Sequence, residues 1–180
     1  MDFMLLGISG SLRRASVNTK LLREVARAYG GPFELADLRL PLYDNDIEKG
    51  EGIPAGVQLL ADQIAGAEAI VISTPEYNQS FSGVLKNALD WVSRTEGKPW
   101  LGKPVAILGA AAGRSGGARA SYALRLAMTS FKPRFVGNEI LLAGAHKEYD
   151  EDGRLASERY QRQVGELCDA LKDEVRRAAV

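Results

Sequence analysis

The chain has 180 residues, enough for one domain with a substantial hydrophobic core. Lys plus Arg and Asp plus Glu both number 23, so no net charge draws the chain to nucleic acid or to an anionic membrane. The single cysteine, Cys168, excludes an internal disulfide, and no apolar run approaches the ~20 residues of a membrane span. We therefore expect a single cytoplasmic domain over residues 1–180, with no nucleic-acid or membrane partner.

The first predicted element is a buried strand over residues 3–8, a nearly continuous apolar run. A polar turn follows at residues 10–18 and leads into a helical pattern that ends at Gly30-Gly31-Pro32. The start of a helix presents free backbone N–H groups and the positive end of the helix dipole, which together favour an anion.

Side chains of this turn strengthen the case for an anion site. Ser11, Ser16 and Asn18 can donate hydrogen bonds, and Arg13 carries a permanent charge on a planar fork of donors. We interpret the turn as a cup for a phosphate monoester. The alternative is an ordinary strand-to-helix turn in which Asn18 is the N-cap.

Two other nucleotide motifs carry little weight. No Gly-Lys-Ser or Gly-Lys-Thr sequence completes a Walker loop, so nucleoside triphosphate chemistry lacks support. The pattern G-x-G-x-x-A occurs at residues 50–55, but it follows no strand and contains Pro54, so we treat it as chance.

Further strands and helices alternate along the middle of the chain. A weak strand is predicted over residues 33–38, a surface loop over 39–55 and a helix over 57–64. Two buried strands then end at distinctive loops. The strand at 69–72 leads into Pro75-Glu76-Tyr77-Asn78, and the strand at 105–108 leads into a glycine-rich loop at 109–117 that contains Ala112 and Gly113. Because ligands bind beyond the carboxyl ends of parallel strands, we expect all three loops to meet at one edge.

The remaining elements complete a doubly wound sheet. We expect a helix over residues 116–130 with Tyr122, Leu126 and Met128 on its apolar side, a fifth strand interrupted by Gly137-Asn138, and an amphipathic helix from Ser157. Five strands and five helices in alternation predict an α/β fold with parallel strands in the order 2-1-3-4-5 and helices on both faces.

Three ordered motifs resemble the NADPH-dependent FMN reductase family of flavodoxin-like quinone, azo-dye and chromate reductases. They are G-S-L-R-x-x-S-x-N at residues 10–18, P-E-Y-N at 75–78 with G-V-L-K-N-A-L-D-W at 83–91, and the glycine-rich stretch at 113–119. The resemblance implies FMN as cofactor, NADPH or NADH as co-substrate, and a small acceptor such as a quinone, azo compound, chromate or free flavin. It also implies a homodimer or homotetramer.

The loops can be assigned to the two ends of FMN. Ser11, Arg13, Ser16 and Asn18 would hold the phosphate, and the ring would lie along two other loops, formed by Pro75, Glu76, Tyr77 and Asn78 and by Ala112 and Gly113. The flavin would do the redox chemistry, so we assign no catalytic side chain and no metal. His146 is expected on an exposed loop and Cys168 in the core.

The helix over residues 83–94 has an apolar arc of about 160°, wider than the roughly 100° that one core contact needs. We expect Trp91 and Val84 to meet a partner subunit, the alternative being that Trp91 packs under the loop that follows the helix. Two other functions share the fold, a flavodoxin-type electron carrier and a flavin-free interaction module. The neutral charge disfavours the carrier, and Arg13, Ser16 and Asn18 disfavour the module.

Overall fold

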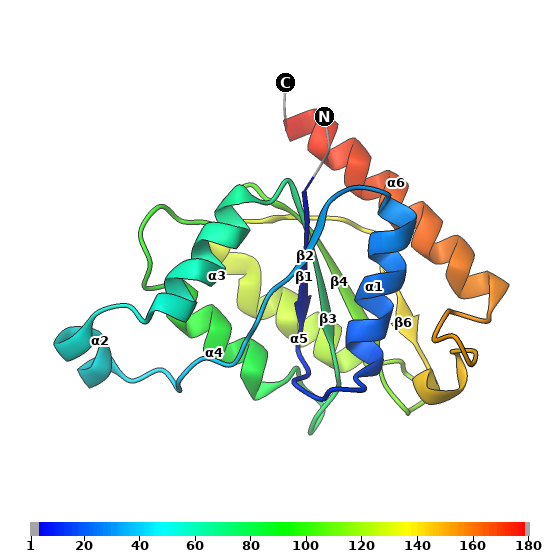
Figure 1. The fold of residues 1–180 in the computed structure, drawn as a ribbon, viewed down its shortest axis with the longest axis horizontal. Coiled ribbons are helices and arrows are strands. Elements are labelled where there is room, and N and C mark those ends of the chain that lie inside the picture. The colour runs from blue at the N-terminus through cyan, green and yellow to red at the C-terminus, as the bar shows by residue number, and fades with distance from the viewer. Residues whose placement is uncertain (1–3, 179–180) are drawn as a thin grey trace.

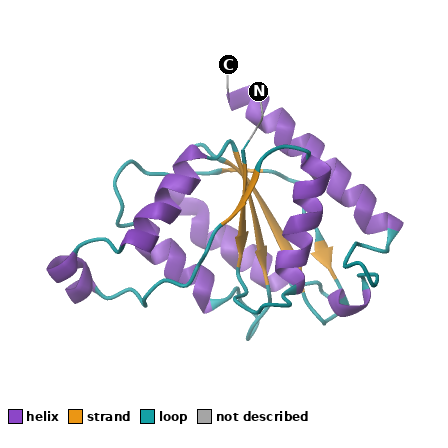
Figure 2. Ribbon diagram, in the orientation of Figure 1, coloured by secondary structure: helices purple, strands orange, loops and turns teal. Residues whose placement is uncertain are grey.

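A parallel β-sheet runs through the middle of the molecule, with helices on both of its faces (Figures 1 and 2). The computed structural model describes residues 4–178, so Phe3 of the first predicted strand lies outside the described residues. The strands are β1 (Leu5–Ser9), β2 (Phe33–Leu35), β3 (Ala69–Thr74), β4 (Pro104–Ala110), β5 (Arg134–Phe135) and β6 (Leu141–Leu142). Their order, β2-β1-β3-β4-β5 with β6 also paired to β4, confirms the predicted fold and topology.

Two groups of helices sandwich the sheet. They are α1 (Val17–Tyr29), α2 (Asn45–Glu51), α3 (Ala55–Gly66), α4 (Gly83–Val92), α5 (Ala118–Met128) and α6 (Glu158–Ala178), with short 3-10 turns η1 (Thr129–Phe131) and η2 (Ala145–Lys147). Helices α1 and α6 pack on one face, and α3, α4 and α5 pack on the other. Every residue of β1, β3 and β4 is buried, which explains why these strands are almost uninterrupted apolar runs. Within the described residues, no helix is both long and apolar enough to cross a membrane.

The fifth strand of the prediction is present in two short pieces. Strand β5 pairs with the start of β4, where Arg134 lies opposite Pro104, and β6 pairs with its end, where Leu141 lies opposite Gly109. The exposed residues Gly137 and Asn138 separate the two pieces, as the sequence indicated.

Residues 39–55 were expected to be a surface loop, and that prediction missed α2. Asp44 caps this helix by accepting a hydrogen bond from the backbone N–H of Asp46, at 2.8 Å. Acidic residues occupy its first turn and Lys49 its last, a distribution that suits the helix dipole. None of its residues is buried, so it has no apolar stripe from which periodicity could identify it.

The predicted apolar face of α5 was correct at Met128 and wrong at Tyr122 and Leu126. Tyr122 is 55% exposed and Leu126 is 78% exposed, whereas Leu124 and Met128 are fully buried. The small residues Ala120 and Ser121 complete the buried side. The prediction followed large apolar residues, so beyond Met128 it did not identify this side of the helix.

The predicted partner contact of Trp91 was also wrong. Its side chain is fully buried within its own chain, where the indole N–H donates to the carbonyl of Pro41 at 2.8 Å. The ring of Tyr43 meets the indole edge-on, with centroids 5.0 Å apart. Asn87 fixes the same segment by donating to the Pro41 carbonyl and accepting from the Tyr43 N–H. Residues 41–43 therefore cover the side of α4 that was expected to face a second subunit.

Candidate cofactor-binding site

The β1–α1 loop (residues 10–16) leads into a capped helix. Ser16 is the N-cap of α1, since its hydroxyl oxygen accepts a hydrogen bond from the Thr19 N–H at 3.3 Å. The alternative in which Asn18 caps the helix is therefore wrong. The backbone N–H groups of Val17 and Asn18, in the first turn of α1, have no partner within the helix and are available to an anion.

Asn18 is buried and ties α1 to two strands. Its Oδ1 accepts from the Ser73 hydroxyl at 2.8 Å and from the Ala110 N–H at 3.2 Å, and its Nδ2 donates to the Ala110 carbonyl at 3.0 Å. Nearby, the Thr19 hydroxyl donates to the hydroxyl of Ser9 at 2.9 Å. These bonds connect the start of α1 to the carboxyl ends of β1, β3 and β4. One amide hydrogen of Asn18 remains for a ligand.

The β3–α4 loop (residues 75–82) contains a tight turn. The backbone groups of Tyr77 and Ser80 exchange two hydrogen bonds of 3.0 Å, and both residues between them have positive φ, 50° at Asn78 and 66° at Gln79. Positive φ at both central positions is the signature of a type I′ turn. The Tyr77 N–H is therefore used in a hydrogen bond within the turn. The Tyr77 side chain, 51% exposed, projects from the loop.

Glu76 anchors this loop to α5. Its carboxylate accepts hydrogen bonds from the Arg119 guanidinium at 2.9 Å and from the Arg119 backbone N–H at 3.2 Å. Arg119 is the second residue of α5, so the negative charge of Glu76 also lies at the positive end of that helix. The carboxylate is thus engaged in an ion pair and does not stand free as a general base.

The β4–α5 loop (residues 111–117) combines close packing with open space. A Cβ at Gly116, where φ is 61°, would lie only 2.4 Å from the carbonyl carbon of Leu141. Only glycine fits there. A Cβ at Gly113 would meet nothing within 4 Å, so this part of the loop leaves room beside it.

The three loops surround one cavity of about 500 Å³, a size typical of small-molecule sites, roughly 300–1,000 Å³. The predicted residues that line it are Ser11, Arg13, Ser16, Asn18, Pro75, Glu76, Tyr77 and Ala112. Asn78 and Gly113 belong to the same loops but are not part of its lining. The donor set fits FMN, because free N–H groups and Arg13 offer one end to a phosphate while Tyr77 offers an aromatic face.

Residues beyond β6 close one side of the cavity and were not predicted. His146 is exposed, as expected, but lines the cavity together with Tyr149 and Asp150, and Lys20 of α1 lines it as well. The Tyr149 hydroxyl donates to the carbonyl of Val17 at 3.0 Å, and burial raises the pKa of this phenol. No local pattern indicates Tyr149, because it lies 132 residues from its partner.

Cys168 lies in the core of the α1/α6 side, as expected from the stripe of α6. Its thiol donates to the Val25 carbonyl at 3.6 Å, and burial raises the pKa of the thiol to about 11. A thiol with a raised pKa is a poor nucleophile at neutral pH, so Cys168 is a packing residue.

The family model described as NADPH-dependent FMN reductase matches residues 3–147. The chain belongs to this family. Membership confirms the resemblance read from the motifs, the enzyme class, and the expected FMN cofactor with NAD(P)H as co-substrate.

Similar proteins agree with this family. An NAD(P)H-dependent FMN reductase of Pseudomonas aeruginosa is 42% identical over 180 residues, which cover 98% of this chain and 97% of that protein. A quinone reductase of Escherichia coli is 44% identical over 141 residues, covering 73% of this chain and 75% of that protein.

Solved structures agree on the fold. The flavoenzyme NAD(P)H:(acceptor) oxidoreductase FerB of Paracoccus denitrificans superposes with a TM-score of 0.87 at 30% identity, covering 97% of this chain and 98% of that one. An archaeal flavodoxin has a TM-score of 0.61 at 13% identity, covering 94% of this chain and 99% of that one, which supports the flavodoxin-like fold alone.

Proposed function

We propose that this protein moves reducing equivalents from NAD(P)H through FMN to a small quinone. The observation that carries the proposal is the convergence of three loops from separate parts of the chain on one cavity whose ends differ in chemistry. FMN would supply the redox chemistry when bound, taking hydride at N5 and delivering it to the acceptor. The residues of the chain would bind, orient and shield it.

At the phosphate end, Arg13, Ser11, Ser16 and the free N–H groups of α1 would hold the dianion. Arg13 is exposed at the cavity, and among residues 4–178 no carboxylate forms an ion pair with it. Its guanidinium is thus free to bind phosphate oxygens in two parallel hydrogen bonds. Asn18 would keep the first turn of α1 aimed at the same point and could donate its remaining amide hydrogen.

At the ring end, residues 75–78 and 112–113 would lie along the edge of the isoalloxazine, with the Tyr77 ring flanking it. Gly113 leaves space on one side, and Pro75 holds the start of the loop against the sheet, where it is buried. We assign no proton-transfer role to Glu76, because its carboxylate is paired with Arg119.

A quinone is the acceptor we favour, because the Escherichia coli relative is a quinone reductase. The test is to load the purified chain with FMN and follow oxidation of NADPH and of NADH with 1,4-benzoquinone, an azo dye, chromate or free FMN. We expect about one FMN per chain and the fastest turnover with the quinone. If the chain is incubated with excess FMN and holds none once the unbound FMN is removed, the proposal is ruled out.

A flavodoxin-type carrier is the second function to exclude. A carrier would retain FMN but would pass electrons only when a partner protein is added. Steady quinone reduction by this chain alone separates the reductase from the carrier.

We also propose a cytoplasmic homodimer or homotetramer, as the family resemblance implies. Leu42 supports a subunit contact, because it is 81% exposed at the centre of residues 41–43, the segment that covers Trp91. Sedimentation of the FMN-loaded protein tests the oligomeric state.

A further inference from the structure

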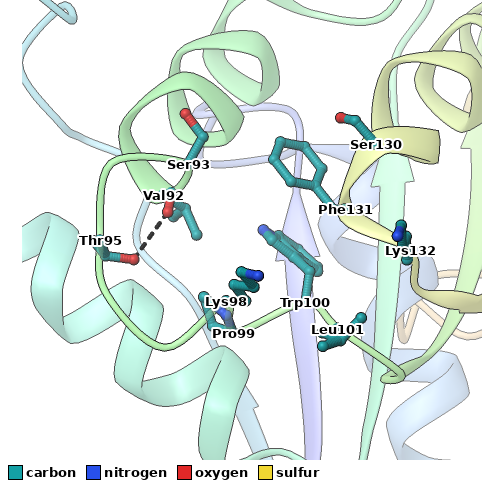
Figure 3. A pocket seen from close by; sticks show the side chains of 10 residues that line it. All are labelled: Val92, Ser93, Thr95, Lys98, Pro99, Trp100, Leu101, Ser130, Phe131 and Lys132. Carbon is teal, nitrogen blue, oxygen red and sulfur yellow. Dashed lines mark hydrogen bonds between the residues drawn. The ribbon is translucent and has the colours of Figure 1, made fainter.

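A second cavity lies at the opposite end of the sheet from the candidate cofactor site. Its walls come from the end of α4, from the segment that precedes β4, and from η1 with the residue after it (Figure 3). Because Pro104 begins β4 just after this segment, the cavity lies at the amino ends of the parallel strands. Its volume of about 350 Å³ falls within the range of small-molecule sites, roughly 300–1,000 Å³.

The walls of this cavity are mostly apolar and partly aromatic. The rings of Trp100 and Phe131 lie 6.5 Å apart with an angle of 33° between their planes, and Val92 and Leu101 add aliphatic surface. Leu101 is 55% exposed, so the cavity is open to solvent on that side. Such walls favour a flat aromatic ligand.

Trp100 leaves a hydrogen-bond donor unused at this cavity. Its side chain is 4% exposed, and its indole nitrogen is buried with no hydrogen-bond partner among the described residues. In Figure 3 the nitrogen edge of the indole is turned toward the middle of the ring of lining side chains. A buried donor without a partner is unfavourable, and an acceptor atom on a ligand would satisfy it.

Two lysines give the cavity a positive charge. Lys98 and Lys132 both line it, and no Asp or Glu side chain does. Within residues 4–178, neither ammonium group lies within 4.0 Å of a carboxylate. Unpaired cations beside an apolar wall favour an anionic ligand.

The backbone of both lysines is also unusual. Among the described residues, four that are not glycine have positive φ. Two of them, Asn78 and Gln79, form the turn at the candidate cofactor site, and the other two are Lys98 at 49° and Lys132 at 54°. Both lysines adopt positive φ at turns: Lys132 is the C-cap of η1, and the Lys98 carbonyl accepts from the Leu101 N–H at 3.0 Å.

We propose that this cavity binds a small planar aromatic carboxylate. The ring packs against Trp100 and Phe131, one carboxylate oxygen accepts the indole N–H of Trp100, and Lys98 and Lys132 balance the charge. The site goes beyond the proposed reductase activity and does not depend on it, because its residues belong to the other end of the sheet.

The two tryptophans of the chain provide a direct test with the unaltered protein. 2-Naphthoate is titrated into the FMN-loaded, ¹⁵N-labelled chain while both indole N–H resonances are followed. We expect the Trp100 resonance to shift saturably and the Trp91 resonance to stay, because Trp91 already donates to Pro41. A Trp100 signal that does not move at millimolar 2-naphthoate overturns the proposal. The W100F variant assigns the two signals.

Substitutions then test the charge. In the double variant K98N/K132N, asparagine tolerates the left-handed backbone while both charges are lost. We expect its dissociation constant for 2-naphthoate, measured by calorimetry, to rise about tenfold or more, and that of W100F to rise a few-fold. K49N, a change of an exposed lysine on α2, is the matched control and should leave the constant unchanged.

Two further comparisons locate the ligand. The neutral analogue 2-naphthamide should bind about tenfold more weakly than 2-naphthoate, since it lacks the charge. The flavin absorption spectrum should not change on binding, whereas a ligand stacked at the cofactor site would perturb it. Equal affinity of the wild type and K98N/K132N, or binding accompanied by a flavin spectral change in both, contradicts the assignment.

Discussion

The β1–α1 loop and the β3–α4 loop lie at the same edge of the sheet, but they are held in different ways. The first leads into the first turn of α1, which is fixed from beneath by buried side chains, with Asn18 bonded to Ser73 and Ala110. The second is held at the surface, by a local turn at Asn78 and Gln79 and by an ion pair in which Arg119 is 60% exposed.

The difference matches the two tasks that the site is proposed to perform. Buried hydrogen bonds hold groups in one geometry before a ligand arrives, which suits retention of a phosphate. A surface ion pair and a short turn are weaker restraints. In the proposed reaction they would allow small adjustments as a nicotinamide and then an acceptor came to the flavin. Substitutions should therefore have large effects in the first loop and the start of α1, and small effects in the second loop.

The largest effect is expected for Asn18→Ala. It leaves the Ser73 hydroxyl and both backbone groups of Ala110 without partners in a buried place, and each such loss costs roughly 1–3 kcal/mol. We expect the free energy of unfolding of the cofactor-free protein, measured in urea, to fall by about 3 kcal/mol. Asn45→Ala, at the exposed start of α2, is the control and should change it by less than about 0.5 kcal/mol. Equal losses of unfolding free energy in both variants would refute a stabilising role for the buried hydrogen bonds of Asn18.

Arg13→Gln should come next, with its effect on cofactor binding rather than on folding. Loss of a charged hydrogen bond to the phosphate should raise the dissociation constant of FMN about tenfold or more, as followed by quenching of flavin fluorescence. Arg14→Gln removes an adjacent exposed arginine that does not line the cofactor cavity. If both variants lose affinity equally, the contribution is general charge and not a specific contact of Arg13.

Glu76→Gln should have a smaller effect. The amide oxygen can still accept from the Arg119 N–H, and a partly exposed ion pair contributes only about 0.2–1 kcal/mol. We expect a loss of unfolding free energy below about 1 kcal/mol, and a quinone-reduction rate within about threefold of the wild type. A loss of activity beyond a hundredfold, with FMN still bound, would instead identify Glu76 as a catalytic acid or base.

Gln79→Gly should have the smallest effect. Glycine adopts positive φ without the strain of a side chain, although it also loses more entropy on folding, so we expect a net gain of only about 0.5 kcal/mol. Gln58→Gly, in the exposed part of α3, is the control and should destabilise by about 1 kcal/mol. In thermal unfolding, we expect the melting temperature to rise in Gln79→Gly and to fall in Gln58→Gly. A loss of stability in both variants would mean that the Gln79 side chain makes a stabilising contact.

The sheet and the meeting point of the three loops were predictable from the sequence because their signals are local. Strands β1, β3 and β4 are buried on both faces and therefore appear as short apolar runs. Each of these runs leads directly into a motif. Parallel pairing then brings the motifs to one edge without further information.

Contacts between distant segments could not be predicted in the same way. The wide apolar arc of α4 indicates that a second surface covers Trp91, but not whether that surface is another subunit or residues 41–43. Likewise, α2 depends on a single cap at Asp44, and Tyr149 reaches the cofactor cavity through a contact with Val17 that spans most of the chain.

Helix α2 extends from the body of the molecule with no buried residue of its own (Figure 1). Its links to the rest are few, chiefly the ion pair of Glu48 with Arg94 at 2.9 Å and the anchoring of Pro41 by Trp91. A segment with so little burial opens by itself, without unfolding the sheet. Its amide hydrogens should be among the first to exchange with deuterium, and a protease should cut it while the protein remains yellow.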